Sequence, residues 1–535
     1  MPKPLIPAIR SLCAAAALAV CLAPASVSAQ QVTAFQQVLA AASAEEDGVG
    51  AFYRSNGYQP IWTGSAESDR ARRAALFDAL ARAPLHGLPA GRYDTIGLKA
   101  RMGAARTMAD IARVEAELSA VLVEYAANLE FGVLEPGRVD SEIKRVVPYR
   151  DRMTYLTQFV QMDPAAFFRT LAPDTPEYRA LMKQKLIYEQ QIDAGGWGAT
   201  VPSGKLEPGQ SGTAVVALRD RLVRMGYLDR SLSRDYDARM KAAVQQFQAA
   251  HGLTEDGVAG GDTIREINVS MEDRLQSVVV AMERERWTNM PRGQRHIWVN
   301  LTDFTAKVID DGKLTFVTRS VIGANSGDRR SPEFSDEMEH MVINPSWYVP
   351  RSIITKEYLP ALQRNPNAVR HLEITDSRGR KVNRGAVNFA AYSARSFPFS
   401  MRQPPSKSNA LGLVKFMFPN KYNIYLHDTP QKALFDREVR AFSHGCIRLA
   451  QPFDFAYTLL ARQEADPEGA FHAILDTGRE TKVVLEQKIP VHIVYRTAFA
   501  NDRGVIEYRR DMYGRDGRIW DALAAQGVVL QAQGS

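Results

Sequence analysis

Cysteine is scarce in this chain. The 535 residues contain three cysteines, Cys13, Cys21 and Cys446. The first two lie in a segment that is typical of a removable export signal, so the mature chain keeps Cys446 alone. One cysteine excludes an intramolecular disulfide and a cysteine-rich metal site. A single thiol in an exported chain is either an inert buried residue or a reactive nucleophile.

Long apolar runs and blocks of like charge are also missing. Beyond the N-terminus, no segment reaches the ~18 consecutive apolar residues that suggest a membrane-spanning helix. Lys and Arg total 67 against 60 for Asp and Glu, which gives a spread-out net charge of +7. This mild basicity suits an anionic polymer and does not indicate nucleic-acid binding. With 45% hydrophobic and 24% charged residues, the composition excludes a mainly disordered or repeat-only chain.

Residues 1–29 have the three parts of a signal peptide. A basic start precedes an apolar core at residues 11–24, which is too short to span a bilayer, and small residues then predict cleavage before Gln30. A lipoprotein signal at Cys21 is the alternative, which Val20 disfavours because a small residue is expected there. We therefore expect a periplasmic protein without a transmembrane segment.

The next part of the chain has helical periodicity. Apolar residues recur at helical spacing from Phe35 and again from Ala74, which predicts a helical scaffold domain over residues 30–200. The aromatic residues around Trp62 and Tyr93 are interpreted as core and turn positions of this domain. A linker rich in Gly and Pro is expected at its end.

Residues 206–268 form a compact unit of short helical patterns. Val215, Leu218 and Leu222 share one helical face, and each pattern stops at a glycine. An apolar-x-x-Phe-Gln helix, then Gly-Leu, Asp-Gly-x-x-Gly and Thr, resembles the signature of the small three-helix peptidoglycan-binding domain. The alternative is a helical spacer that has lost binding.

From about residue 296 the apolar period changes to two. Alternating runs on both sides of Asp311-Gly312 predict a β-hairpin, and another strand is expected from Tyr422 to His427. We expect a mainly β domain over residues 294–500, with a cap inserted at about 351–408 that serves as a lid, and a C-terminal extension at 501–535 packed on it. The fold class is thus multidomain α+β. Arginines suited to carboxylate ligands are spread along the cap: Arg351, Arg364, Arg370, Arg378 and Arg380.

The neighbours of Cys446 favour reactivity. It lies in Ser443-His444-Gly445-Cys446-Ile447-Arg448, and His427 ends the expected strand nineteen residues earlier. An imidazole can take the proton of a thiol nucleophile, and Arg448 adds a positive charge and donors for a carboxylate. Gly445 permits close backbone approach, so the amides around it are candidate oxyanion donors. A structural thiol prefers apolar neighbours, which makes a nucleophile the favoured interpretation.

A metal site is the competing interpretation. His427, His444 and Cys446 offer three ligands, but a structural zinc site needs four, and no CxxC motif or second cysteine completes it. Spacing alone leaves a catalytic zinc with His472 or His492 open, although no motif supports it. We expect no metal and no cofactor.

Two motifs resemble those of a known family. Tyr425-Leu426-His427-Asp428-Thr429 followed by the Ser443-to-Arg448 motif resembles the catalytic signature of L,D-transpeptidases with a YkuD-type domain. The domain order is similar to that of the large YcbB-type members, which combine a scaffold, a peptidoglycan-binding domain and a capped catalytic domain. Three further stretches are also similar to these members: Asn344-Pro345 with Trp347-Tyr348-Val349-Pro350, Asn409-Ala410-Leu411-Gly412, and Phe435 before Arg440-Ala441-Phe442.

The resemblance implies roles for individual residues. Cys446 is the nucleophile and His427 is its base. Gly445, Asp428 and His444 are candidates for forming the oxyanion site or orienting the catalytic groups. For Asp428 either its carboxylate or its carbonyl would orient the imidazole, and for His444 a contact with the thiolate competes with a turn role. Substrate contacts are expected from Arg448, Ser443, Tyr425 and Trp347.

The resemblance also implies a reaction. Such enzymes use peptidoglycan tetrapeptide stems as donor and acceptor, hold an acyl-thioester on the cysteine and make 3→3 cross-links, which contribute to cell shape. They are carbapenem targets, and other cell-wall synthesis enzymes are expected partners. The alternatives are an L,D-carboxypeptidase, attachment of a protein to peptidoglycan by the same thiol, and a non-catalytic wall-binding protein.

Overall fold

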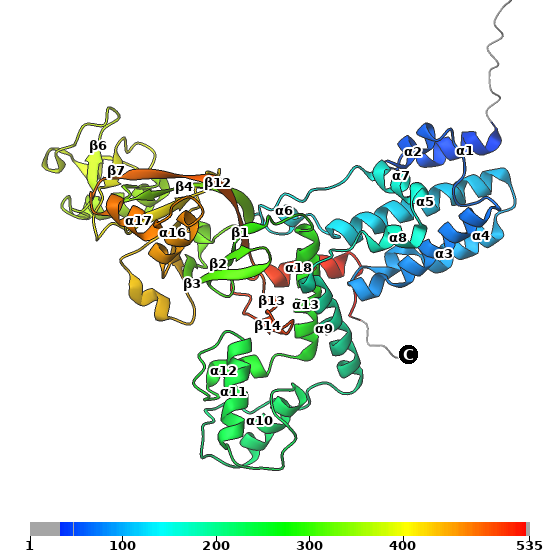
Figure 1. Cartoon of the computed structure of the whole chain (residues 1–535), viewed down its shortest axis with the longest axis horizontal. Coiled ribbons are helices and arrows are strands. Elements are labelled where there is room, and N and C mark those ends of the chain that lie inside the picture. The colour runs from blue at the N-terminus through cyan, green and yellow to red at the C-terminus, as the bar shows by residue number, and fades with distance from the viewer. Residues whose placement is uncertain (1–32, 47, 531–535) are drawn as a thin grey trace, which may run out of the picture.

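The computed structural model describes residues 33–46 and 48–530, and Figure 1 shows their arrangement. A helical domain and a mainly β domain extend from a central group of helices, and a small helical unit hangs below it (Figure 1). This confirms the multidomain α+β fold class. The expected signal peptide lies outside the described residues. Within the described ranges, no helix is both long enough and apolar enough to cross a membrane.

The N-terminal helical domain is organised around the long helix α5 (Met108–Phe131). Shorter helices surround it: α1 (Ala34–Ser43), α2 (Val49–Ser55), α3 (Glu67–Ala81), α4 (Thr95–Ala104), α7 (Arg152–Gln161) and α8 (Pro164–Arg169). The buried carboxylate of Glu115 accepts hydrogen bonds from the Tyr53 hydroxyl (2.8 Å) and the Thr63 amide (2.9 Å). These bonds join the stretch around Trp62 to α5, and the Tyr93 hydroxyl accepts from Asn128 of the same helix (3.1 Å). Both aromatic side chains are buried in the core, as expected.

The small helical unit contains α10 (Thr213–Arg224), α11 (Ala238–Ala250) and α12 (Gly261–Ile267). The buried Gln248 amide explains the sequence signature, because it joins α11 to the following loop and to α12. Its nitrogen donates to the Val258 carbonyl (3.0 Å) and the Thr263 hydroxyl (3.1 Å), and its oxygen accepts from the Gly257 amide (2.9 Å). Val215, Leu218 and Leu222 are buried in the unit's own apolar core.

The β domain is a sheet that closes on itself. Its strands are β1 (Arg295–Asn300), β2 (Thr305–Asp310), β3 (Lys313–Gly323), β4 (Phe334–Ile343), β8 (Val414–Met417), β9 (Leu426–His427), β10 (Ala441–Ser443), β11 (Ile447–Leu449) and β12 (Thr481–Val494). The order is β10-β3-β11-β9-β8-β4-β12-β1-β2, and β2 also pairs with β3, so only β10 lies outside the ring. Asp311 and Gly312 both adopt positive φ in the β2–β3 turn, which confirms the hairpin. Helices α16 (Pro452–Leu460) and α17 (Pro467–Leu475) pack against the sheet's apolar core.

The cap is a subdomain with its own sheet and core. Strands β5 (Trp347–Tyr348), β7 (Ser400–Gln403) and β6 (Glu373–Thr375) pair in that order. A continuous helical segment runs through α14 (Arg351–Ile353), the π-helical η4 (Ile354–Tyr358) and α15 (Leu359–Arg364). Leu362, Ile374 and Phe389 are buried among cap residues. The inserted segment is therefore a folded unit rather than a long loop.

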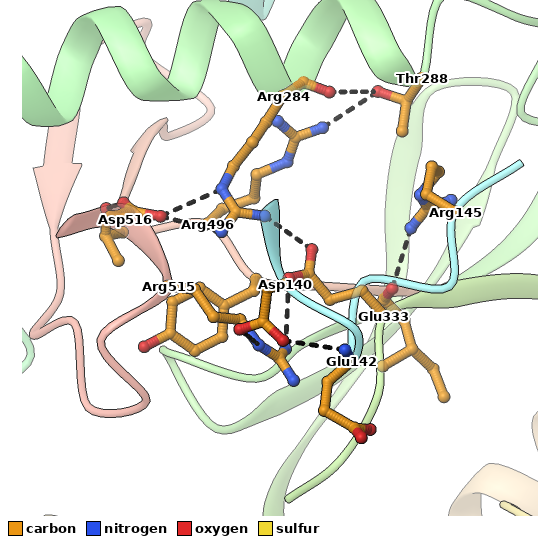
Figure 2. Close-up of polar contacts among 12 residues, drawn as sticks. Asp140, Glu142, Arg145, Arg284, Thr288, Glu333, Arg496, Arg515 and Asp516 are labelled. Atoms are coloured by element: carbon orange, nitrogen blue, oxygen red, sulfur yellow. Dashed lines mark hydrogen bonds and ion pairs between the residues drawn. The ribbon is translucent and has the colours of Figure 1, made fainter. Parts of the chain in front are cut away.

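The central group of helices and strands, called the hub here, comprises α9 (Pro176–Asp193), α13 (Met271–Trp287), β13 (Ala498–Ala500), β14 (Ile506–Tyr508) and α18 (Arg515–Ala525). Its apolar core includes Leu275 of α13 and Ile519 of α18. The C-terminal segment therefore packs on α9 and α13 as well as on the β domain, which it contacts through Tyr513. Buried charges join these parts: Arg284 donates to Glu333 (2.7 Å) and to Asp516 (3.0 Å) (Figure 2).

Candidate active site

The two sequence motifs meet because β9 and β11 are neighbouring parallel strands. Arg448 is paired with His427, and Ile447 with Leu426. Since side chains alternate along a strand, Cys446 and Arg448 lie on the same face as His427. These three residues line one cavity of about 1090 Å³ between the sheet and the cap. The structure thus brings together residues that are nineteen positions apart in the sequence.

The imidazole of His427 is held by the backbone next to it. Its Nδ1 lies 2.5 Å from the Asp428 carbonyl oxygen, which can only accept a hydrogen bond. Nδ1 is therefore the protonated nitrogen of the neutral ring, and Nε2 is left as the proton acceptor. Burial, together with the positive charge of Arg448, lowers the pKa of His427 to about 3. At neutral pH the ring is an uncharged base.

Asp428 orients this histidine through its carbonyl and not through its carboxylate. The carboxylate accepts hydrogen bonds from the amides of Leu413 (2.9 Å) and Thr429 (2.7 Å), and forms an ion pair with Lys432 (2.6 Å). These bonds fix the backbone that presents the carbonyl to His427.

Cys446 is a half-buried free thiol whose Sγ contacts the Asn423 carbonyl oxygen (3.5 Å). Burial raises the pKa of the Cys446 thiol to about 11, although hydrogen bonding to Tyr425 and the charge of Arg448 oppose this shift. Thiol and imidazole are therefore both uncharged at neutral pH, and attack by sulfur needs proton transfer to the base.

Hydrogen bonds between its own residues stabilise the turn before Cys446. The Ser443 hydroxyl accepts from the Gly445 amide (3.1 Å) and donates to the Cys446 carbonyl (2.5 Å). Gly445 has φ +110°, and a Cβ there would lie 3.2 Å from the Ile424 Cδ1 atom, so both conformation and space favour glycine. Ser443 and the Gly445 amide thus hold the turn, although both were expected to face substrate.

Arg448 is poised for a carboxylate. Its Nη1 donates to the Gln431 side-chain oxygen (2.6 Å), and Gln431 lines the same cavity. Its buried Nε has no hydrogen-bond partner among the described residues. A half-buried guanidinium with an unpaired donor favours an anionic group of a ligand.

Tyr425 and Trp347 form an aromatic wall of the cavity. The Tyr425 ring lies edge-on to His427, with ring centroids 5.6 Å apart. Burial raises the pKa of Tyr425 well above its usual value, and the nearby Cys446 adds to this shift. The phenol therefore keeps its proton and can donate to sulfur.

His444 points to the cap. Its Nε2 lies 2.6 Å from Glu357 Oε1 in η4, and Arg329 donates to the same oxygen (2.6 Å). Lys356 of the cap pairs with Asp328 nearby (2.5 Å). His444 is therefore a contact between the catalytic turn and the cap, which neither of the two roles considered from the sequence anticipated.

Sequence reasoning missed Glu357, Gln431 and Asn423. Asn423 has φ +56° and interrupts the first part of the strand expected over residues 422–427, so that β9 begins only at Leu426. Asparagine tolerates this conformation better than most residues, so an asparagine inside an alternating run was a usable signal for a break in the strand. Of the five cap arginines, only Arg351 lines the cavity, and its guanidinium donates to the Ala394 and Phe397 carbonyls of the cap.

The histidines considered for zinc have other partners. His472 contacts the Tyr457 hydroxyl (2.8 Å), and His492 contacts the Ser335 hydroxyl (2.7 Å). Within residues 33–46 and 48–530, no group of three or more His, Cys, Asp or Glu residues is placed to hold a metal ion.

The uncharged thiol predicts a pH profile. Because only the thiolate is alkylated, and the pKa of Cys446 is raised to about 11, its reaction with iodoacetamide should accelerate about tenfold per pH unit from about pH 6 to 9. Urea-unfolded protein is the control, and its rate should level off above about pH 8.5. A plateau near neutral pH in the folded protein would indicate a thiolate–imidazolium pair and contradict the prediction.

Three parts of the chain match known domain families. Residues 294–484 match the L,D-transpeptidase catalytic domain, residues 211–267 match a family described as "Putative peptidoglycan binding domain", and residues 47–184 match the "Scaffold domain" family. A Haemophilus influenzae protein named "Putative L,D-transpeptidase" is 30% identical over 252 residues, which are 46% of this chain and 50% of that protein. The match thus spans about half the length of this curated relative.

Two solved L,D-transpeptidase structures are similar at 14% identity. The one from Xylanimonas cellulosilytica (its residues 123–326) has a TM-score of 0.17, with 56% of this chain and 98% of that chain covered. The one from Stackebrandtia nassauensis has a TM-score of 0.22, with 56% and 97% covered. Residues 294–484, which bring Cys446 and His427 into one cavity, thus match the catalytic domain of the L,D-transpeptidase family, and the same chain matches a scaffold domain family and a peptidoglycan-binding domain family.

Proposed function

We propose that this protein is a periplasmic L,D-transpeptidase that forms 3→3 cross-links in peptidoglycan through an acyl-enzyme on Cys446. One observation carries the proposal: a free thiol, a neutral imidazole with Nε2 as acceptor, and a guanidinium with a free donor line the same cavity. This set supplies a nucleophile, a base and a carboxylate-binding group for acyl transfer.

The first half-reaction transfers the donor stem to the enzyme. Cys446 loses its proton to Nε2 of His427 as sulfur attacks the carbonyl carbon of the third stem residue. The tetrahedral intermediate collapses when the bond to the terminal D-Ala nitrogen breaks. His427 returns the proton to that nitrogen, so D-Ala leaves as a neutral amine and a thioester remains.

The second half-reaction uses an amine of a second stem. The side-chain amine of its diaminopimelate attacks the thioester carbonyl and gives a proton to His427, and the sulfur leaves and is reprotonated. Water in place of the amine gives an L,D-carboxypeptidase, and an amine of a protein attaches that protein to the wall. Cationic Arg448 suits a stem carboxylate in either step.

The cap serves as a lid in this proposal. Its residue Glu357 contacts His444 of the catalytic turn, so the cap borders the cavity at this side. Closing it over a bound stem excludes water and favours the amine acceptor over hydrolysis.

The deciding experiment incubates the purified protein with disaccharide-tetrapeptide and identifies the products by mass. A cross-linked dimer with release of D-Ala is the expected result. A tripeptide monomer would identify a carboxypeptidase, and unchanged substrate would favour the non-catalytic alternative.

A carbapenem should form one covalent adduct per chain. Its strained carbonyl presents the same electrophile as the donor stem, and Cys446 is the free cysteine of the described residues. Intact-protein mass should rise by one carbapenem, and peptide mapping should place it at Cys446. An adduct that persists in Cys446→Ala would contradict this prediction.

We propose that residues 206–268 hold the enzyme on peptidoglycan and take no part in the chemistry. The unit folds around its own core, and its ends are joined, because the Val201 amide donates to the Asn268 side chain (2.8 Å). Replacing residues 202–267 by a short linker should lower binding to isolated sacculi at least about fivefold and leave muropeptide turnover within about threefold. Loss of both together would show that the unit supports the fold instead.

A further inference from the structure

The C-terminal segment reaches the catalytic turn through one serine. Residues 498–530 lie outside the part of the chain that matches the catalytic-domain family. Two of them contact Ser331, which is fully buried in the loop between β3 and β4. Arg515 Nη2 donates to the Ser331 carbonyl (2.9 Å), and the Tyr513 hydroxyl accepts from the Ser331 amide (3.4 Å).

Ser331 in turn holds the residue before the nucleophile. Its hydroxyl donates to the Gly445 carbonyl (2.6 Å) and accepts from the Gly323 amide (3.0 Å). The Tyr513 hydroxyl donates to the Gly323 carbonyl (2.5 Å), so both sides of this contact depend on the C-terminal segment. The backbone here is closely packed, because a Cβ on Gly323 would lie 2.0 Å from the Arg329 carbonyl oxygen.

Arg515 is itself fixed by its surroundings. Its side chain is fully buried, and its guanidinium lies over the rings of Tyr495 (5.2 Å) and Tyr513 (4.9 Å). Glu333 accepts from Arg515 (3.2 Å) with one oxygen and from Arg284 (2.7 Å) with the other. Figure 2 shows Arg515 beside Asp140 and Glu333, at the point where the scaffold, the hub and the β domain meet. Removing one partner of such a buried ion pair is costly, because it leaves a buried charge unpaired.

We propose that Arg515 and Ser331 are positioning residues that set the orientation of the peptide unit between Gly445 and Cys446. A trans peptide is planar, so anchoring the Gly445 carbonyl also fixes the direction of the Cys446 N–H and the place of its Cα. The thiol and the adjoining amide then meet the donor carbonyl at a defined angle, as acyl transfer requires. The inference rests on the proposed function for its kinetic readout.

Two variants test the proposal, with one matched control. Ser331→Ala removes the hydroxyl, and Arg515→Lys keeps the charge but loses the planar fork that reaches both Ser331 and Glu333. Arg496→Lys is the control, because Arg496 is a buried arginine beside the hub whose side chain forms an ion pair with Glu285 (2.8 Å) and donates to the Thr288 hydroxyl (3.0 Å) instead. For each, kcat and KM on disaccharide-tetrapeptide, the pH profile of thiol alkylation and the unfolding temperature are measured.

We expect Ser331→Ala to lower kcat at least about tenfold with KM within about twofold, and Arg515→Lys to lower it about three- to tenfold. The alkylation profile of both should shift to lower pH, because a loosened turn exposes the thiol to water. Arg496→Lys should unfold at a lower temperature than the wild type and keep the wild-type kcat and alkylation profile. The proposal would be overturned if the loss of kcat simply followed the fall in unfolding temperature across all three variants. It would also be overturned if Ser331→Ala kept the wild-type kcat and alkylation profile.

Failure of the proposed function is separable from failure of this inference. If the wild-type protein does not turn over the muropeptide, the transpeptidase proposal fails. The alkylation profile needs no substrate and still decides whether Ser331 and Arg515 control the environment of Cys446.

Discussion

Replacing Cys446 by alanine should abolish turnover, with a loss of more than about 10³-fold in product formation from disaccharide-tetrapeptide. The reaction needs a covalent acceptor for the donor stem, and Cys446 is the free thiol that lines the cavity. The fold should survive, because the half-buried side chain loses only its sulfur and contributes little packing. The measurements are product mass after extended incubation and the unfolding temperature.

Cys446→Ser is the companion variant, because its hydroxyl keeps a nucleophile of lower reactivity in the same place. We expect it to retain the fold and to show at most a trace of acylation, since neutral His427 must then deprotonate an alcohol. Cross-linking above a few per cent of wild type in Cys446→Ala would mean that another group forms the acyl-enzyme. That result would remove the basis of the proposed mechanism.

Local sequence was sufficient wherever structure depends on neighbours along the chain. The Asp311-Gly312 hairpin follows from residues that accept positive φ, and the Gln248 signature follows from a side chain that bonds within its own small domain. The Cys446 motif predicts a reactive thiol on local grounds too, because a glycine, a histidine and an arginine are unusual neighbours for a structural thiol. The pairing of His427 with Arg448 needed only that the two short strands be adjacent.

Contacts between distant segments could not be predicted in this way. Glu357 reaches His444 across 87 positions, and Arg515 reaches Ser331 across 184. Neither glutamate nor arginine carries a local pattern that distinguishes these positions from solvated surface charges. The extension at 501–535 was expected on the β domain, which Tyr513 contacts, but Ile519 packs in the hub. A short amphipathic helix does not specify which apolar surface it covers.

The roles of Ser443 and Asp428 illustrate a further limit. A hydroxyl or a carboxylate beside a catalytic residue suggests direct chemistry, yet both of these groups bind backbone amides and fix local geometry. Whether the carbonyl or the carboxylate of Asp428 orients His427 depends on the rotation of that one residue, and the sequence carries no information on this rotation. The fold decides between carbonyl and carboxylate through the amides of Leu413 and Thr429, which occupy the carboxylate.

Replacing His427 by asparagine should lower kcat about 10³-fold at neutral pH, since the base is lost while an amide N–H can still reach the Asp428 carbonyl. His472→Asn is the matched control, because His472 is a histidine of the same domain that contacts Tyr457 and does not line the cavity. It should keep wild-type kcat.

The size of the His427→Asn defect should depend on pH in a defined direction. Without a base, attack requires a thiolate that forms by itself, and the pKa of Cys446 is raised to about 11, so the thiolate fraction grows as pH rises toward that value. The wild type attacks as a neutral pair, because the pKa of His427 is lowered to about 3 and the ring stays a base throughout the neutral range. The ratio of wild-type to variant kcat should therefore shrink by roughly tenfold per pH unit between about pH 7 and 9. A ratio that stays constant over this range would assign His427 to structure, and the base of the reaction would then have to be sought elsewhere in the cavity.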